Sequence, residues 1–203
     1  METEKSSKNQ TPFLRGRKVI LCPRDKNRHL ENCYRWINDS DVNYFLAVFA
    51  PQTRAGEEEW FDEPNKDNRN IVFAIETFDG KHIGMIGLHN INWKDRTATT
   101  GAVIGEKEFW GKGYGTDAKM MLLDFAFNEL GLEKINSEAY EFNKRSINYS
   151  LGCGYKKEGK RRSQIFRRGR RWNTILLGVL REEWLPIWEE YRKTGKANRR
   201  KKK

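Results

Sequence analysis

Three glycines alternate with larger residues in the segment Trp-Gly-Lys-Gly-Tyr-Gly-Thr, residues 110–116. A stretch rich in β-forming residues precedes the segment, and apolar residues at three- and four-residue spacing follow it, so it joins a strand to an amphipathic helix. Glycines leave room for a ligand, and the N–H groups that begin a helix attract anions. The sequence therefore predicts a backbone cradle for a pyrophosphate, made by Trp110, Gly111, Lys112, Gly113, Tyr114, Gly115 and Thr116.

Other interpretations of this glycine-rich segment remain open. It could be a turn that only reverses the chain direction. A Walker A loop would end in Gly-Lys-Ser or Gly-Lys-Thr, which the segment does not. A dinucleotide-binding loop needs an acidic residue about 20 positions further on, and Glu138 lies near that distance. A nucleotide-binding protein is therefore a minor alternative.

The cysteines and histidines show no metal-binding pattern. Cys22, Cys33 and Cys153 are odd in number and lack Cys-x-x-Cys spacing, so neither a disulfide framework nor a structural zinc site is expected. The three histidines are scattered and form no His-Glu-x-x-His motif. We expect three reduced thiols and no metal.

The elements that would position the cradle follow from periodicity and turn residues. The first third is expected to hold a strand over 18–22 and helices over 30–36 and 54–62. Alternating apolar residues then predict strands over 71–77, 82–91, 97–104 and 134–140. The helix after the cradle places Ala118, Met121, Leu122, Phe125 and Ala126 on one face. It makes a β-α-β unit, whose two strands must be parallel.

The last third of this mixed α/β chain is expected to hold a short helix and a basic hairpin. The helix should run from Arg145 to Leu151. The hairpin should pair 156–167 with 172–180 around an Arg168-Gly169 turn.

Length and charge limit the organisation of the chain. At 203 residues we expect a flexible polar arm over 1–13, one domain over 14–191 and a basic disordered tail over 192–203. The tail carries eight of the eleven net positive charges. It could bind RNA or ribosomes electrostatically, or be a solvated end. No apolar run could span a bilayer and no secretory signal is present, so we expect a cytoplasmic protein with no membrane partner.

The cradle resembles the coenzyme motif of the GNAT superfamily, Gln/Arg-x-x-Gly-x-Gly/Ala. Gly113-Tyr114-Gly115 matches its end, and Trp110 replaces Gln or Arg, as in the branch of ribosomal-protein N-terminal acetyltransferases and spermidine acetyltransferases. The resemblance continues through residues 34–39, 140–146, 154–155, 168–170 and 180–184, and covers nearly all of 14–185. It implies a twisted, mostly antiparallel sheet of about seven strands with a central parallel β-α-β unit, flanked by helices.

The resemblance also implies the reaction. An amine would attack the thioester carbonyl of acetyl-CoA, the co-substrate, while a backbone N–H aims at the developing oxyanion. That N–H would come from Val103, Ile104 or Gly105. Asn143 is similar to an asparagine that contacts the coenzyme, and it could equally cap the helix that follows.

The catalytic residues depart from those of many relatives, which place a tyrosine four residues before the position of Gly154 to protonate the leaving thiolate. Ser150 stands there, with Tyr149 beside it, so the proton donor is expected to be Ser150, with Tyr149 more suited to packing. Acids found in relatives are replaced by Thr99 or Thr100 and by Asn173. The alternative function is therefore a weakly or non-catalytic acyl-CoA-binding module associated with RNA or ribosomes.

The acceptor is expected to be the amine of a small molecule, a polyamine or a peptide. By the resemblance it would bind near Glu58, Glu59 and Trp60, unless these residues form only a solvated helix face. The basic hairpin could bind the adenosine 3′-phosphate of the coenzyme or an acidic partner. The sequence allows a monomer or a homodimer.

Overall fold

The computed structural model describes residues 12–63 and 68–197, which form two compact units that alternate along the chain. Unit 1 comprises residues 12–63, 72–87 and 102–121, and unit 2 comprises 68–71, 88–101 and 122–197. The eight strands have the order β1-β2-β3-β4-β5-β6-β8-β7. Strands β4 (His82–Asn92) and β5 (Thr97–Ile104) each contribute residues to both units.

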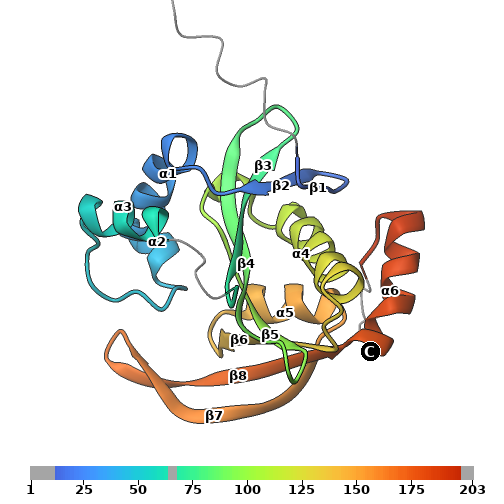
Figure 1. Cartoon of the computed structure of the whole chain (residues 1–203). Coiled ribbons are helices and arrows are strands. Elements are labelled where there is room, and N and C mark those ends of the chain that lie inside the picture. Colours follow the sequence, from blue (N-terminus) through green and yellow to red (C-terminus); the bar gives the residue numbers. More distant parts are fainter. Residues whose placement is uncertain (1–11, 64–67, 198–203) are drawn as a thin grey trace, which may run out of the picture. The chain divides into compact units, whose positions relative to one another are not determined.

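Unit 1 combines antiparallel strands with three helices. β1 (Leu14–Arg15) pairs with β2 (Val19–Pro23), which pairs with β3 (Ile71–Thr77). Helices α1 (Lys26–Asn38), α2 (Ser40–Asn43) and α3 (Arg54–Asp62) lie together beside them (Figure 1). The Asp25 carboxylate caps α1 by accepting from the backbone N–H of Arg28, and the Thr53 hydroxyl caps α3 by accepting from that of Gly56.

The core of unit 1 joins its helices to its strands. Leu30, Cys33 and Trp36 recur on one face of α1, as the 3.6-residue period requires. The buried cluster consists of Cys22, Leu30, Cys33, Trp36, Val42, Phe61, Ala74 and Met85. Partly buried Trp60, Val103 and Trp110 pack against it.

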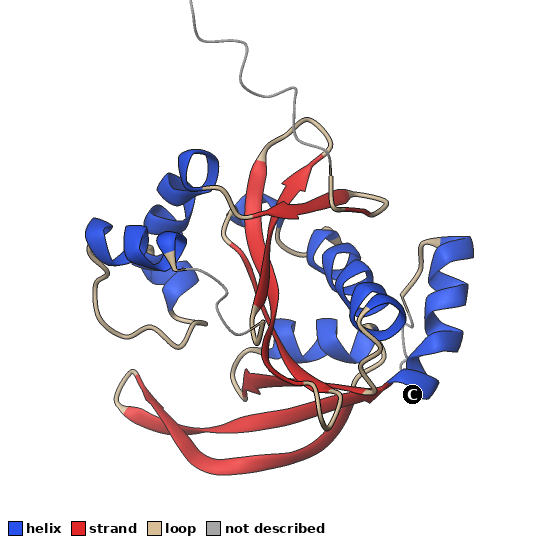
Figure 2. Cartoon of the chain, in the orientation of Figure 1, coloured by secondary structure: helices blue, strands red, loops and turns tan. Residues whose placement is uncertain are grey.

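Unit 2 contains the parallel pair. The first half of β5 runs parallel to β6 (Lys134–Tyr140), with Thr97 opposite Lys134. β6 pairs antiparallel with β8 (Arg170–Leu180), and β8 pairs with β7 (Lys156–Arg167) in a long hairpin (Figure 2). The β5-β6 pair confirms the expected parallel β-α-β unit.

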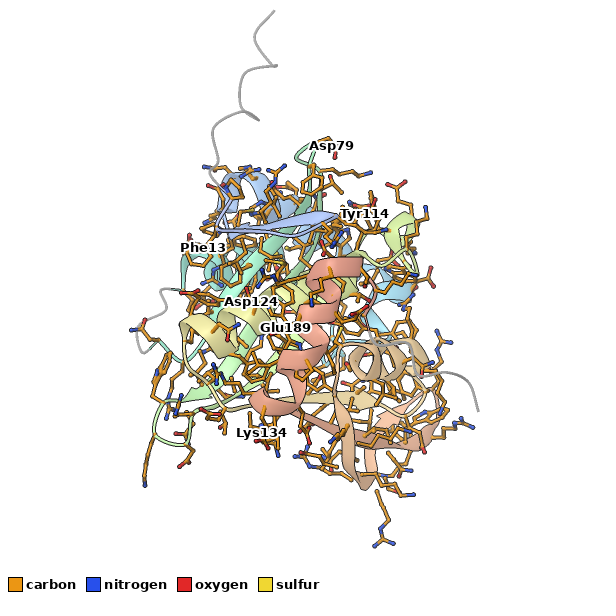
Figure 3. The ribbon with its side chains drawn as sticks, turned by 90° about the vertical axis from the view of Figure 1, so that its right-hand side faces the viewer. Phe13, Asp79, Tyr114, Asp124, Lys134 and Glu189 are labelled. Atoms are coloured by element: carbon orange, nitrogen blue, oxygen red, sulfur yellow. The ribbon has the colours of Figure 1, made fainter. Side chains whose placement is uncertain are left out.

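Three helical segments complete the fold. α4 (Tyr114–Asp124) begins directly after the glycine segment and continues into a π-helical turn, Phe125–Glu129. α5 spans Lys144–Gly152, and α6 spans Arg181–Thr194. Trp184, Trp188 and Tyr191 recur on the buried face of α6 and stack on one another, while Glu189 lies on its exposed face (Figure 3).

The structure confirms the predicted α/β fold and corrects several details. β1 brings the number of strands to eight, and the short helix α2 lies between the two helices expected in the first third. Arg192, assigned to the tail, lies in α6, which extends to Thr194. Phe13, assigned to the arm, donates its backbone N–H to the Leu21 carbonyl at 3.1 Å. Residues 1–11 and 198–203 lie outside the described residues. No helix in the described ranges is long and apolar enough to cross a bilayer.

Candidate active site

The glycine segment forms an exposed loop at the start of α4. Gly111 and Gly113 have φ of +73° and +87°, a conformation that disfavours other residues. A Cβ added at Gly111 would meet nothing within 4 Å, and one at Gly113 would meet only the end of Lys18, at 3.8 Å. The space over both glycines is therefore open. The first N–H groups of α4, beginning at Tyr114 (Figure 3), have no carbonyl partner within the helix, as an anion site requires.

Residues from the start of the chain hold this loop in place. The Asp117 carboxylate, fully buried in the first turn of α4, accepts the backbone N–H groups of Arg17, Lys18 and Val19 at 3.1, 2.7 and 3.1 Å. The Lys18 ammonium donates to the Lys112 carbonyl at 2.9 Å and lies 5.3 Å from the centre of the Tyr114 ring. Lys18 and Asp117, which lie about 100 residues apart along the chain, were not among the site residues predicted from the sequence.

The end of β5 is fixed against the core of unit 1. The Trp110 indole N–H donates to the Ile104 carbonyl at 2.6 Å, which connects the strand to the start of the loop. The N–H of Gly105 donates to the Ile83 carbonyl at 2.9 Å, and a Cβ at Gly105 would overlap the Trp36 ring. The Gly105 N–H is therefore engaged by the neighbouring strand, which counts against Gly105 as the oxyanion donor.

Unit 2 holds the candidate residues that follow β6. The Asn143 side-chain oxygen accepts the backbone N–H of Ser146 at 3.1 Å, which confirms its role as the cap of α5. Its amide NH₂ group has no hydrogen-bond partner among the described residues, so it can still donate to a ligand.

Ser150 and Tyr149 lie on α5 in different surroundings. Ser150 is completely buried, and its carbonyl accepts the N–H groups of Cys153 and Tyr155 at 3.0 and 3.2 Å. Burial raises the pKa of Tyr149 well above its ordinary value, with nearby Cys153 and Tyr155 adding to the shift. The raised pKa weakens the Tyr149 phenol as a proton donor, but a serine hydroxyl is a weaker acid still, so the preference for Ser150 rests on its position four residues before Gly154.

The predicted acceptor residues on α3 already have contacts in unit 1. Glu58 forms an ion pair with Arg54 at 3.1 Å, and Glu59 is exposed. Trp60 packs on the core, and the Arg24 guanidinium lies 4.7 Å from its ring centre. The acid that α3 buries is Glu57, which sequence analysis did not select.

A second buried group of polar side chains connects α1 with β2 and β3. The ligand atoms of Cys22, His29 and Glu76 lie within 4.8 Å of one another. The Asp25 N–H donates to His29 Nδ1, so His29 Nε2 carries the proton and donates to Glu76 at 2.8 Å, beside the Arg28 guanidinium. Burial opposes ionisation of Glu76, but the His29 bond and the Arg28 charge prevail and lower its pKa. These mutual bonds make a structural network that a cation would have to displace.

Comparison with known proteins agrees with these features. The family model described as "Acetyltransferase (GNAT) domain" matches residues 18–156. The SPbeta prophage-derived N-acetyltransferase YokL of Bacillus subtilis (strain 168) is 31% identical over 148 residues, which cover 73% of this chain and 82% of YokL. YdaF of the same strain, a candidate ribosomal N-acetyltransferase by name, is 36% identical over 115 residues, which cover 57% of this chain and 62% of YdaF.

A solved structure shows the same fold. The crystal structure of spermidine N-acetyltransferase from Vibrio cholerae in complex with CoA and spermine superposes with a TM-score of 0.77 and 23% sequence identity. The match covers 82% of this chain and 98% of the other.

Proposed function

Since the chain belongs to the GNAT family of N-acetyltransferases, we propose that it transfers the acetyl group of acetyl-CoA to a primary amine within a ternary complex. The observation that carries the proposal is the loop 110–116, in which two positive-φ glycines leave open space before the N-terminus of α4. The Lys18 ammonium, which donates to the Lys112 carbonyl, adds positive charge beside this loop. The proposed acceptor is a small amine, a polyamine or a protein N-terminus, and the relatives include, by name, a ribosomal N-acetyltransferase and spermidine N-acetyltransferases.

In the proposed reaction, the neutral amine attacks the thioester carbonyl, so that a C–N bond forms and the C–S bond breaks. A backbone N–H of Val103 or Ile104 stabilises the oxyanion. The amine loses a proton to water, and Ser150 gives its proton to the leaving thiolate and regains one from solvent. The test is release of CoA thiol from acetyl-CoA with spermidine, a small monoamine and a peptide with an unblocked N-terminus. No release with any of them would refute the proposal.

Replacement of Ser150 tests the proton donor. We expect Ser150→Ala to lower kcat by about 10- to 100-fold and to leave the affinity for acetyl-CoA unchanged, because a donor to the thiolate acts late in the reaction. Tyr149→Phe keeps the packing and should retain wild-type kcat. Steady-state kinetics with calorimetric titration of acetyl-CoA measures both, and the reverse result would assign the role to Tyr149.

A basic surface supports a second candidate function, RNA binding. Residues 156–164 of β7 are all exposed, and side chains with nitrogen ends project from the β7–β8 hairpin (Figure 3). Lys157, Lys160 and Arg162 form no ion pair among the described residues, and Phe166 is 61% exposed. Unpaired cations beside an exposed aromatic ring suit the phosphates and bases of single-stranded RNA. The tail beyond Gly195 adds six positive charges.

Charge reversal on this hairpin should separate RNA binding from acetylation. The triple variant Lys157→Glu, Lys160→Glu, Arg162→Glu removes three cations. For binding to single-stranded RNA, we expect the magnitude of the slope of log association constant against log salt concentration to fall by at least about 2. Each lost cation removes about 0.7 of a released counterion. Acetylation of a small amine should keep its kcat. Lys156→Gln, which removes a cation paired with Glu183, is the control. Unchanged RNA affinity in the triple variant would exclude the hairpin as the RNA site.

A further inference from the structure

The cations around α3 in unit 1 are engaged by other groups. Arg54 pairs with Glu31 and Glu58, and Lys26 pairs with Asp62 at 2.6 Å. The third, Arg24, donates to the Glu63 carbonyl and covers the Trp60 ring. Glu58 and Asp62 of the helix thus have basic partners, and none of these three cations pairs with its most buried acid.

That acid is Glu57, which is only 7% exposed. It lies one turn before Phe61 on the side of α3 that faces the core. Its carboxylate has no ion pair and no hydrogen bond to any described residue, and burial raises its pKa. The titratable group beside it is Cys33 of α1, whose pKa burial raises to about 12, so the thiol is neutral and supplies no counter-charge. An unpaired carboxylate in such a place destabilises the protein unless a ligand supplies the missing charge.

The surroundings of Glu57 connect it with the proposed coenzyme site. Cys33 and Phe61 belong to the core cluster of unit 1, against which Val103 of β5 and Trp110 of the glycine loop also pack. A cation held at Glu57 would therefore lie in the same part of the unit as the strand proposed to hold the thioester. Aromatic rings of Trp60 and Phe61, 5.0 Å apart between centres, border the same face of α3 and suit an alkylammonium group.

We propose that Glu57 binds an ammonium group of the acceptor that is distinct from the neutral amine attacking the thioester, so that the bound substrate carries at least one positive charge. This inference rests on the proposed acetyl transfer and adds a specificity-determining residue to it. The carboxylate supplies the charge, the rings of α3 supply the apolar contact, and the ammonium group supplies a partner that Glu57 lacks among the residues that the structure describes.

The test compares 1,4-diaminobutane with its uncharged analogue 1,4-butanediol. The diamine should raise the melting temperature of the wild-type protein, and the diol should not, because only the diamine pairs with a buried carboxylate. In Glu57→Gln the diamine should give no shift, and KM for the diamine should rise by about 30-fold or more with acetyl-CoA affinity unchanged. Asp62→Asn removes an exposed acid of the same helix, one that is paired with Lys26, and should behave as wild type.

Stability without ligand gives an independent result. Because the folded-state pKa of Glu57 is raised, its charge costs stability above that pKa, and the cost disappears as the pH falls toward 4.5, the ordinary value. Glu57→Gln should therefore melt at a higher temperature than wild type at pH 8, with the difference lost near pH 4.5. If Glu57 instead stabilised the folded protein, Glu57→Gln would melt at a lower temperature than wild type.

The outcomes separate this inference from the proposed function. If the wild type acetylates the diamine and Glu57→Gln has the same KM, the inference is overturned and the function stands. If the wild type releases no thiol with any amine, the function fails. The melting experiment then still decides the inference, because an equal diamine shift in both proteins, or no shift in either, overturns it.

Discussion

Gly113→Val should reduce the affinity for acetyl-CoA by at least about 100-fold, the largest functional effect expected of a single substitution in this chain. The added side chain would stand in the open space over the loop, where the pyrophosphate is proposed to bind. Valine also resists the φ of +87° at this position, so we expect the free energy of unfolding to fall by about 1–3 kcal/mol. Calorimetric titration with acetyl-CoA and urea denaturation measure the two effects.

The hairpin between β3 and β4 offers a matched control. Gly80 has φ of +83°, and a Cβ there would also meet nothing within 4 Å. Gly80→Val therefore carries nearly the same backbone strain at a place remote from the loop in sequence, and it should lose similar stability with wild-type coenzyme affinity. Wild-type affinity in folded Gly113→Val would remove the basis of the coenzyme assignment. An equal loss in Gly80→Val would attribute the effect to stability alone.

The parts of the fold with strong local signals could be predicted from the sequence. The strands 71–77, 97–104 and 134–140 have the predicted bounds, because alternation and flanking turn residues define each end. The helix 54–62 also agrees, since Thr53 caps it and Pro64 prevents its continuation. Local chemistry fixes these boundaries without help from distant residues.

Elements whose local signals conflict could not be predicted. Pro186 lies inside α6 and removes one backbone hydrogen bond of the helix. A proline at this position therefore predicts from sequence that no continuous helix forms here. Stacking of Trp184 on Trp188 and of Trp188 on Tyr191, with ring centres 5.3 and 6.0 Å apart, offsets that loss in the folded chain. The short helix α2 gave no periodic signal because it spans only Ser40–Asn43.

Some residues of the candidate site could likewise be predicted from the sequence, and others could not. Its glycine loop is continuous in sequence and could be located there. The burial of Glu57 could not be predicted from the sequence. Glu57 stands in an acidic run, and only the packing of α3 decides which of its carboxylates faces the core. The hydrogen bonds of Asp117 depend on a segment about 100 residues earlier, a separation at which sequence spacing carries no information.

Asp117→Ala should lower the free energy of unfolding by about 3 kcal/mol or more. The substitution leaves the backbone N–H groups of Arg17, Lys18 and Val19 without their acceptor, and each unsatisfied donor away from water costs about 1–3 kcal/mol. Coenzyme affinity should fall as well, because the same bonds place Lys18 beside the Lys112 carbonyl in the loop. Urea denaturation and calorimetric titration measure the two quantities.

Asp124, at the end of the same helix, distinguishes this role from a general need for acids on α4. Burial raises the pKa of Asp124, and its carboxylate accepts a hydrogen bond from the Asn128 amide at 2.8 Å. Its charge therefore costs stability near neutral pH, so Asp124→Asn should be neutral or slightly stabilising at pH 7 and should bind acetyl-CoA like wild type. If Asp117→Ala proved no more destabilising than Asp124→Asn, the attachment of residues 17–19 to α4 could not be what holds the coenzyme loop in place.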